Sequence, residues 1–472
     1  MATIGSTRGT NIPALDAAGS NFRITPESYT TIDNLIKATK DEVMPDLVET
    51  YGDQGITGFL KLTGAINAGG ASDQIDWWEA GRRHKTLAYT ATNTTIDVSG
   101  ADFVTITDAA VKAGCQANDV LMDASSGARF IVKSGGFGTG TAANVVLLKL
   151  DGTDVASADI DAATTGGTLV ILGNMYAQGT NQPTAFRESD IVRYKNPFMI
   201  VKGRHEVSGS QATNIGWVNV GGGEHRWFMY AEAEARKRFE DQREMMMLFG
   251  EKFDGAGAGV NLDNGLAGSE GYFAAVEDRG INISNANSNP LDSFAEFDDI
   301  IIELDKQGAP SEYAMYVNRK QDLAIDDMLA SGIATGVTAG LAGQFGAFNN
   351  SADMAVKLGF KSFTRGGYTF HKHDWKLLND PTLLGASNYV QGAMVPMSQV
   401  TDARSGMKAP SLAMYYKEAN GYSREMDHWV TGGGVLGHTN NGDLGTDQAV
   451  FHYRSEVALC VRAANQHVMI KG

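Results

Sequence analysis

The sequence contains one motif with metal-binding potential, His371-Lys372-His373-Asp374. On a β-strand alternate side chains point to the same face, so the imidazoles of His371 and His373 would lie side by side. A structural Zn²⁺ site needs four ligands, and the sequence identifies no third ligand for this pair. We therefore interpret the motif as two half-exposed strand residues and predict no metal site.

Two pairs of adjacent carboxylates, Asp298-Asp299 and Asp326-Asp327, fall in segments with helical periodicity. Consecutive side chains on a helix point in different directions, whereas a catalytic acid–base pair must converge on one substrate. We interpret both pairs as solvated helix faces.

The aromatic and basic residues Trp77-Trp78 and Arg82-Arg83-His84 could form a surface that stacks bases and contacts phosphates. In an extended segment, however, alternation sends the two tryptophans to opposite faces. Packing against two different neighbours is the interpretation we favour.

Three sequence motifs typical of enzymes are missing. GxxxxGK[ST], HExxH and GxSxG do not occur, and the glycine clusters at 135–140 and 255–259 lack the GxGxxG spacing. We therefore predict no catalytic, cofactor-binding or metal-ligating residue, no cofactor and no enzymatic activity.

The composition is that of a globular protein with an acidic balance. The chain has 472 residues, 43% hydrophobic, and a formal net charge of −16, which disfavours gripping nucleic-acid phosphates. Cys115 and Cys460 match no metal or redox spacing, so we expect two reduced thiols. No apolar run reaches membrane-spanning length, and Met1 opens no signal-peptide pattern.

The stretch from Glu224 to Gly250 predicts the helix around which the chain is organised. At 1.5 Å per residue it would be about 39 Å long, and Gly250 is suited to end it. Its expected buried stripe follows steps of three and four: Phe228, Ala231, Ala235, Phe239, Gln242, Met246 and Phe249. We interpret the methionines at 245–247 as core filler.

Further elements surround this helix. Residues 1 to about 25 read as an extended arm, and 26–51 hold two short helical patterns. A helix is predicted over 294–307, with a capping box formed by Ser293 and Glu296. Strands are predicted at EYAMYVN, YTFHKHDW, SLAMYYKE, AVFHYRSEVALCVR and HVMIKG, and a helix of about three turns at RKQDLAIDDMLAS.

Residues 91–189 differ from the rest of the chain in their pattern of residue types. The short β-branched runs TTIDV, FVTIT, DVLMD, RFIVK, NVVLLKL and TLVIL alternate there with Gly, Asp, Ser and Ala. This pattern predicts a small all-β domain set inside an α+β chain.

The order of these parts resembles the major capsid proteins of tailed double-stranded-DNA bacteriophages, the Hong Kong phage capsid fold. DWWEAGRRHKTLAYT and DIVRYKNPFMIVKGRHEVSGS resemble the strands of its extended hairpin, the E-loop. EHRWFMYAEAEARKRFEDQREMMMLFGEK resembles the spine helix of its peripheral (P) domain, and VFHYRSEVALCVRAANQHVMIKG its final strands. A subgroup of the family carries a β-rich insertion in the E-loop.

The resemblance also implies a division into domains. Residues 1–55 would form an N-terminal arm with short helices, and residues 56–90 and 190–220 an E-loop that is interrupted by the inserted domain at 91–189. Residues 221–310 and 449–472 would form the P-domain, with the spine helix at 224–249, and residues 311–448 the axial (A) domain.

It also implies a structural subunit of a virion. Such a subunit self-assembles into hexamers and pentamers that form an icosahedral shell around double-stranded DNA, without reading its sequence. The same resemblance implies assembly in the bacterial host cytoplasm. It implies portal, scaffolding and decoration proteins as possible partners, and no association with a membrane.

Two other functions remain compatible with the sequence. Glycine-rich loops with scattered Trp and Asp are typical of β-rich carbohydrate-active enzymes, although no carboxylate pair converges in any stretch. Residues 91–189 could instead form an adhesin-like binding domain.

Overall fold

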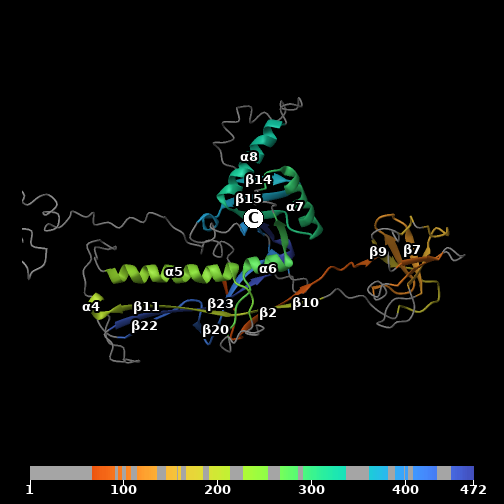
Figure 1. Ribbon diagram of the computed structural model, residues 1–472. Helices are drawn as coiled ribbons and strands as arrows, with labels where there is room; N and C mark the ends of the chain where they lie inside the picture. The colour runs from red at the N-terminus through yellow and green to blue at the C-terminus, as the bar shows by residue number, and fades with distance from the viewer. Residues whose placement is uncertain are drawn as a thin grey trace, which may run out of the picture. The chain divides into compact units, whose positions relative to one another are not determined.

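The computed structural model describes residues 66–90, 94–97, 103–107, 114–134, 145–156, 158–160, 166–183, 191–212, 227–253, 266–284, 291–335, 361–380, 389–397, 399–401, 408–432 and 448–472. The chain divides into two compact units, residues 76–195 and the remainder. Both contain strands, and the larger one also contains the long helices, so the α+β prediction is confirmed (Figure 1).

The smaller unit is built around a seven-stranded sheet. Its strand order is β3-β9-β6-β7-β8-β5-β4, and every pairing in it is antiparallel. The strands are β3 (Thr86–Tyr89), β4 (Thr94–Asp97), β5 (Phe103–Ile106), β6 (Asp119–Asp123), β7 (Arg129–Ser134), β8 (Val145–Lys149) and β9 (Gly167–Asn174). The strand runs expected here are therefore confirmed. Alternate residues such as Leu121, Phe130 and Leu147 form its dry core.

A long strand, β23 (Gln448–Val461), forms the centre of the main sheet of the larger unit. It pairs antiparallel with β11 (Met199–Ser208) on one edge, and with β22 (Asp427–Gly432) and β19 (Leu412–Tyr416) on the other. Strand β1 (Ile66–Ala68) adds to β19 in parallel. We call the three-stranded part β11–β23–β22 the ribbon.

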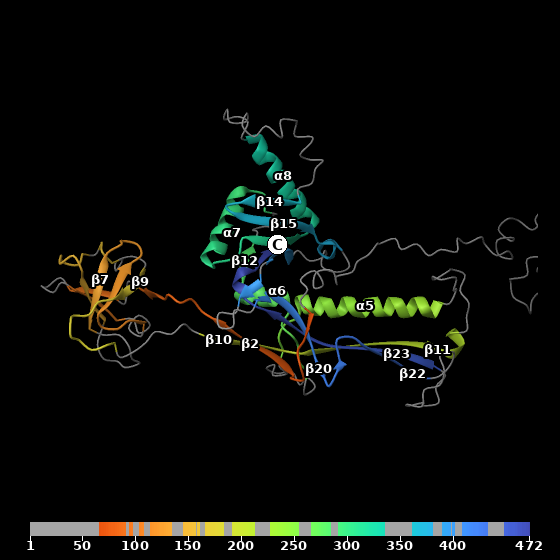
Figure 2. The same ribbon diagram turned by 180° about the vertical axis from the view of Figure 1, so that it is seen from behind.

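Helix α5 (Trp227–Phe249) runs along the ribbon, as both views show (Figures 1 and 2). Phe239 is the contact point, because its ring lies 5.7 Å from that of Tyr453 and packs with Phe451. A Cβ on Gly203 of β11 would approach the Phe239 ring to 2.8 Å, so a glycine is needed beneath it.

The buried face of α5 differs from the expected stripe. Gln242 and Met246 are exposed, whereas Arg243, Glu244 and Met247 are buried. The correction has a physical reason: the Arg243 guanidinium reaches inward to the carbonyl of Glu425 at 3.3 Å, so a charged position lies on the packed face. Of the three methionines only Met247 is fully core; Met245 packs at its edge.

A second, six-stranded sheet has the order β12-β24-β16-β13-β15-β14. These strands are β12 (Ile281–Ser284), β13 (Glu312–Val317), β14 (Ser362–Arg365), β15 (Tyr368–Asp374), β16 (Val390–Pro396) and β24 (Val468–Lys471). Helix α7 (Phe294–Lys306) packs on it through Phe297, Ile300 and Leu304. The predicted capping box of Ser293 with Glu296 is present. Helix α8 (Arg319–Thr335) is longer than the three turns expected.

The remaining elements are short. They are β2 (Gln74–Ala80), β10 (Ile191–Pro197), α4 (Gly209–Ala212), α6 (Tyr272–Arg279), the 3₁₀ turns η5 (Lys376–Asn379) and η6 (Ala464–Gln466), β17 (Gln399–Thr401), β18 (Lys408–Pro410), β20 (Glu418–Ala419) and β21 (Tyr422–Ser423). Cys115 and Cys460 are buried thiols. Within the described ranges no helix has the length and apolarity needed to cross a membrane.

Several expectations lie outside the described residues. They are the arm at 1–25, the two short helices of 26–51, the start of the long helix at 224–226, and the glycine clusters at 135–140 and 255–259. The five strands expected between Glu312 and the C-terminus are confirmed.

The packing of α5 on the ribbon makes a testable prediction. Phe239→Ala should cost about 3–5 kcal/mol, because the ring is 2% exposed and a cavity would remain. Hydrogen exchange of the α5 amides measures the loss. The exposed neighbour Gln242→Ala serves as the control and should stay within about 0.5 kcal/mol of wild type. Equal protection in both variants would contradict this packing.

Candidate functional site

The histidine motif lies on β15, as expected. His373 stacks on Tyr316 of the neighbouring strand β13, with ring centroids 5.3 Å apart. Burial, followed by the nearby His371, lowers the pKa of His373. Among the described residues no group of three or more His, Cys, Asp or Glu side chains could hold a metal ion.

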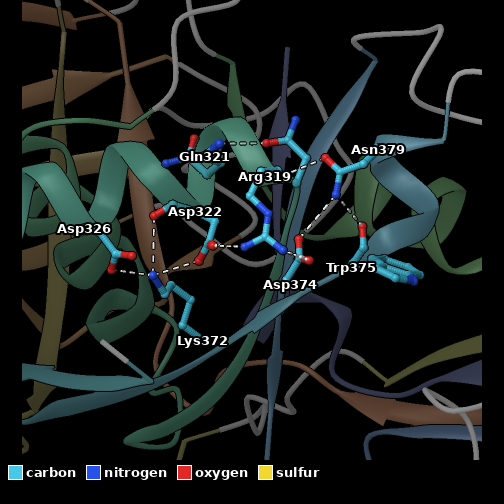
Figure 3. A network of polar contacts seen from close by, with 9 residues as sticks. Arg319, Gln321, Asp322, Asp326, Lys372, Asp374, Trp375 and Asn379 are labelled. Carbon is cyan, nitrogen blue, oxygen red and sulfur yellow. Dashed lines mark hydrogen bonds and ion pairs between the residues drawn. The ribbon is translucent and has the colours of Figure 1, made fainter. Parts of the chain in front are cut away.

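Lys372, between the two histidines, points to the opposite face and is almost fully buried. Its Nζ forms ion pairs with the carboxylates of Asp322 at 2.7 Å and Asp326 at 2.5 Å, both on α8 (Figure 3). This is the alternation that strand geometry requires. The sequence analysis missed Lys372, although a charged residue flanked by two half-exposed ones on a strand signals an inward-facing charge.

Arg319 extends the same network at the first turn of α8. Its guanidinium contacts Asp322 at 2.8 Å and also Asp374 at the end of β15. The side-chain oxygen of Asn379 accepts the backbone N–H of Arg319 at 2.8 Å (Figure 3). Every carboxylate of this network therefore touches a cation. The arrangement fixes α8 on the sheet and leaves no carboxylate poised as a general base.

The two adjacent acidic pairs diverge as predicted. Asp298 accepts two hydrogen bonds of 2.5 Å from the guanidinium of Arg365, and this contact lowers the pKa of its carboxyl. Its neighbour Asp299 is exposed. Asp326 contacts Lys372, whereas Asp327 faces solvent. Neither pair forms a dyad.

The tryptophan pair alternates as predicted, but of the two rings only Trp77 is packed as expected, and Trp78 is exposed. Trp77 is 6% exposed and lies 5.8 Å from the ring of Tyr194, whereas Trp78 is 64% exposed beneath the guanidinium of Arg193. Both tryptophans are on β2, which pairs only with β10 among the described strands. The basic turn Arg82-Arg83-His84 is exposed.

The β2–β10 pair presents large apolar side chains to solvent on both strands. Ile191 and Val192 of β10 are 66% and 45% exposed, in addition to Trp78. Ile191 and Val192 are consecutive on β10 and therefore point to opposite faces of the pair. Exposed apolar side chains gathered on one small element mark a site of interaction with another molecule. The β2–β10 pair is therefore the candidate functional site.

A buried histidine at the C-terminal end of the chain is a separate feature. His467 is fully buried, and its Nδ1 lies 3.2 Å from the hydroxyl of Tyr272 on α6. Its Nε2 has no hydrogen-bond partner among the described residues. Burial alone lowers the pKa of His467 to about 3, so the ring is neutral in the folded chain.

No protein-family model matches the sequence, and no curated protein matches it. The fold is similar to solved phage and encapsulin structures. Mycobacterium phage Adephagia shares 8% identity at a TM-score of 0.39, over 93% of this chain and 97% of that one. The mature capsid of bacteriophage PhiM1 shares 8% identity at a TM-score of 0.37, and the match covers 92% of this chain and 91% of that one. The holo-SrpI encapsulin complex from Synechococcus elongatus shares 8% identity at a TM-score of 0.34, and the match covers 60% of this chain and 77% of that one.

Removing Lys372 should destabilise the packing of α8 on the sheet. Lys372→Met leaves the buried carboxylate of Asp322 short of one cation, which costs about 3–5 kcal/mol. Chemical denaturation measures this loss. Lys361→Met, the same change at an exposed lysine, is the control and should have an effect below about 0.5 kcal/mol. Equal effects would show that the network contributes nothing.

His467 should make stability depend on pH in one direction. Its folded pKa of about 3 lies below the ordinary value of 6.5, so unfolding takes up a proton between these values. Stability should fall as pH drops from about 6.5 towards 3, by up to about 1.4 kcal/mol per pH unit, and be unaffected by this residue above 6.5. His467→Gln removes this contribution. Parallel pH–stability curves for the two proteins would refute it.

Proposed function

We propose that the chain is a structural subunit that assembles with identical copies into a closed shell. The exposed apolar side chains of the β2–β10 pair carry this proposal. A two-stranded sheet is marginally stable in water by itself. Here Trp78, Ile191 and Val192 are exposed on it as well. A neighbouring copy that covers the β2–β10 pair would stabilise the two strands and also bury these apolar side chains.

The long α5 helix and the ribbon support the same proposal. A rod of 23 residues packed on a 14-residue central strand makes a stiff beam that holds its shape while contacts form at distant points. A closed shell needs heterologous contacts, in which each copy presents different surfaces to different neighbours. A stiff subunit keeps the angle between those surfaces constant.

The particular shell we propose is a phage capsid. Hexamers and pentamers would form an icosahedral particle around double-stranded DNA, with portal, scaffolding and decoration proteins as further partners. The acidic balance of −16 suits such a container, because an inner wall that repels phosphates lets DNA pack without sticking. No catalytic role is proposed.

The domain division is part of this proposal. Residues 1–55 would be the arm, 56–90 and 190–220 the E-loop, and 91–189 an inserted domain that reinforces neighbours or contacts a decoration protein. Residues 221–310 and 449–472 would be the P-domain, and 311–448 the A-domain.

The test is assembly of purified protein, followed by negative-stain microscopy and light scattering. Wild type should form shells, tubes or capsomer rings. Ile191→Asp should raise the critical concentration for assembly at least about tenfold, because burying an isoleucine contributes about 1.5–3 kcal/mol. Asn181→Asp adds the same charge at an exposed polar position and is the control. A wild type that stays monomeric at high concentration would refute the proposal.

A further inference from the structure

The ribbon has two faces, and only one of them packs against α5. Tyr453, Phe451 and Val207 turn towards the helix. The opposite face holds a groove of about 360 Å³, which we call the ribbon groove. Its lining includes side chains that alternate away from α5, those of Lys202, Arg204, Trp429, His452 and Arg454. Gly203 and Tyr453, which lie between them on the strands, complete the lining.

The groove is cationic and aromatic. The imidazole of His452 stacks on Trp429 at 5.0 Å with an interplanar angle of 13°, and the Arg454 guanidinium lies 5.1 Å over the same indole. Lys202 and Arg204 follow on β11, side by side with Arg454 and His452 in the strand register. Among the residues that the structure describes, no carboxylate lines the groove.

Only some of the cationic side chains of the groove form ion pairs with carboxylates of neighbouring residues. Arg204 contacts Glu206 at 2.9 Å and Arg454 contacts Asp427 at 2.5 Å. Lys202 is exposed and forms no ion pair within the part of the chain that the structure describes. The groove therefore fits a ligand with several carboxylates, which would pair with its cations, and with apolar side chains, which would pack on its aromatic rim.

Apolar surface flanks the cations. Ile200 precedes Lys202 by two residues on the same face of β11 and is 52% exposed. Tyr422, 49% exposed, accepts a hydrogen bond from Arg454 at 2.9 Å. A purely ionic partner such as a phosphate backbone would leave this apolar surface uncovered, and the net charge of −16 would repel it.

We propose that residues 41–53 of the same chain, DEVMPDLVETYGD, occupy the ribbon groove. This segment, which lies outside the described residues, carries five carboxylates and no Lys or Arg: Asp41, Glu42, Asp46, Glu49 and Asp53. It also carries Val43, Met44, Leu47, Val48 and Tyr51. Its carboxylates match the groove's cations, and its apolar residues match Trp429, Tyr422 and Ile200.

The segment is tethered within reach of the groove. Residue 53 precedes β1 by 12 residues, 54–65, which span at most about 40 Å when extended. Ile66 pairs with Met414, and Met414 with Leu459. His452 lies seven residues from Leu459 along β23, or about 23 Å. A tether of this length keeps the segment at an effective concentration in the millimolar range, which favours the same chain over a second copy.

Zero-length carbodiimide coupling of the full-length protein tests the proposal. The reagent joins Lys202 Nζ to a carboxylate in contact with it, and peptide mass spectrometry identifies the partner. Mixing protein of natural isotopic composition with ¹⁵N-labelled protein before coupling shows whether the two peptides come from one chain. We expect Lys202 coupled to a carboxylate of residues 41–53, in products that are entirely light or entirely heavy.

Charge reversal provides the matched comparison. Arg204→Glu keeps Lys202 but should lower the yield of this product at least about threefold, as should 1 M salt, because exposed ion pairs are weakened by either change. Arg238→Glu makes the same change on the exposed side of α5 and should leave the yield unchanged.

Three results would overturn the proposal: no product at Lys202, coupling of Lys202 only to carboxylates outside 41–53, or products of mixed isotopic composition, which would make a second copy the occupant. The outcome is independent of shell formation. Coupling within one chain can occur in a protein that never assembles, and shells can form without it.

Discussion

The pairing of β23 with strands on both of its edges is the constraint on which the larger unit depends. Its first ten residues pair with β11, and its opposite edge is divided between β22 and β19. Nearly every residue of β23 is consequently buried, and the aromatic side chains at Phe451 and Tyr453 form the floor on which α5 lies. A 23-residue helix would gain little stability from propensity alone; this floor supplies the apolar surface it needs.

Cations are placed individually in this acidic chain. Lys372 lies between two carboxylates of α8, Arg365 holds Asp298 of α7, and Lys417 and Arg424 hold the buried Glu456 of β23. Each of these contacts joins elements that are distant in the sequence. The cost of leaving a buried carboxylate without its cation applies to Glu456, whose side chain is 6% exposed, whereas Asp298 is 47% exposed and its pair with Arg365 contributes less. The ribbon groove differs because its cations face outward.

Local features of the fold were accessible from the sequence because they depend on neighbouring residues. The capping box at Ser293 and the alternation of Trp77 and Trp78 need only local geometry. The buried face of α5 was not accessible, because the inward turn of Arg243 depends on a carbonyl 182 residues away. The same holds for β12, whose partner β24 is the last strand of the chain. Strands β2 and β10 were predicted as extended sequence, but the exposure of Ile191 could be seen only in the structure.

The way the chain enters and leaves its smaller unit has a practical consequence. Both crossings fall within paired strands, where Asp76 of β2 contacts Arg193 of β10 and Trp77 lies beside Tyr194. A unit whose two ends are adjacent can be exchanged for any other polypeptide with adjacent ends without breaking the sheets of the host unit. Because both crossings lie side by side, the smaller unit is suited to replacement by a foreign domain at a single place in the chain.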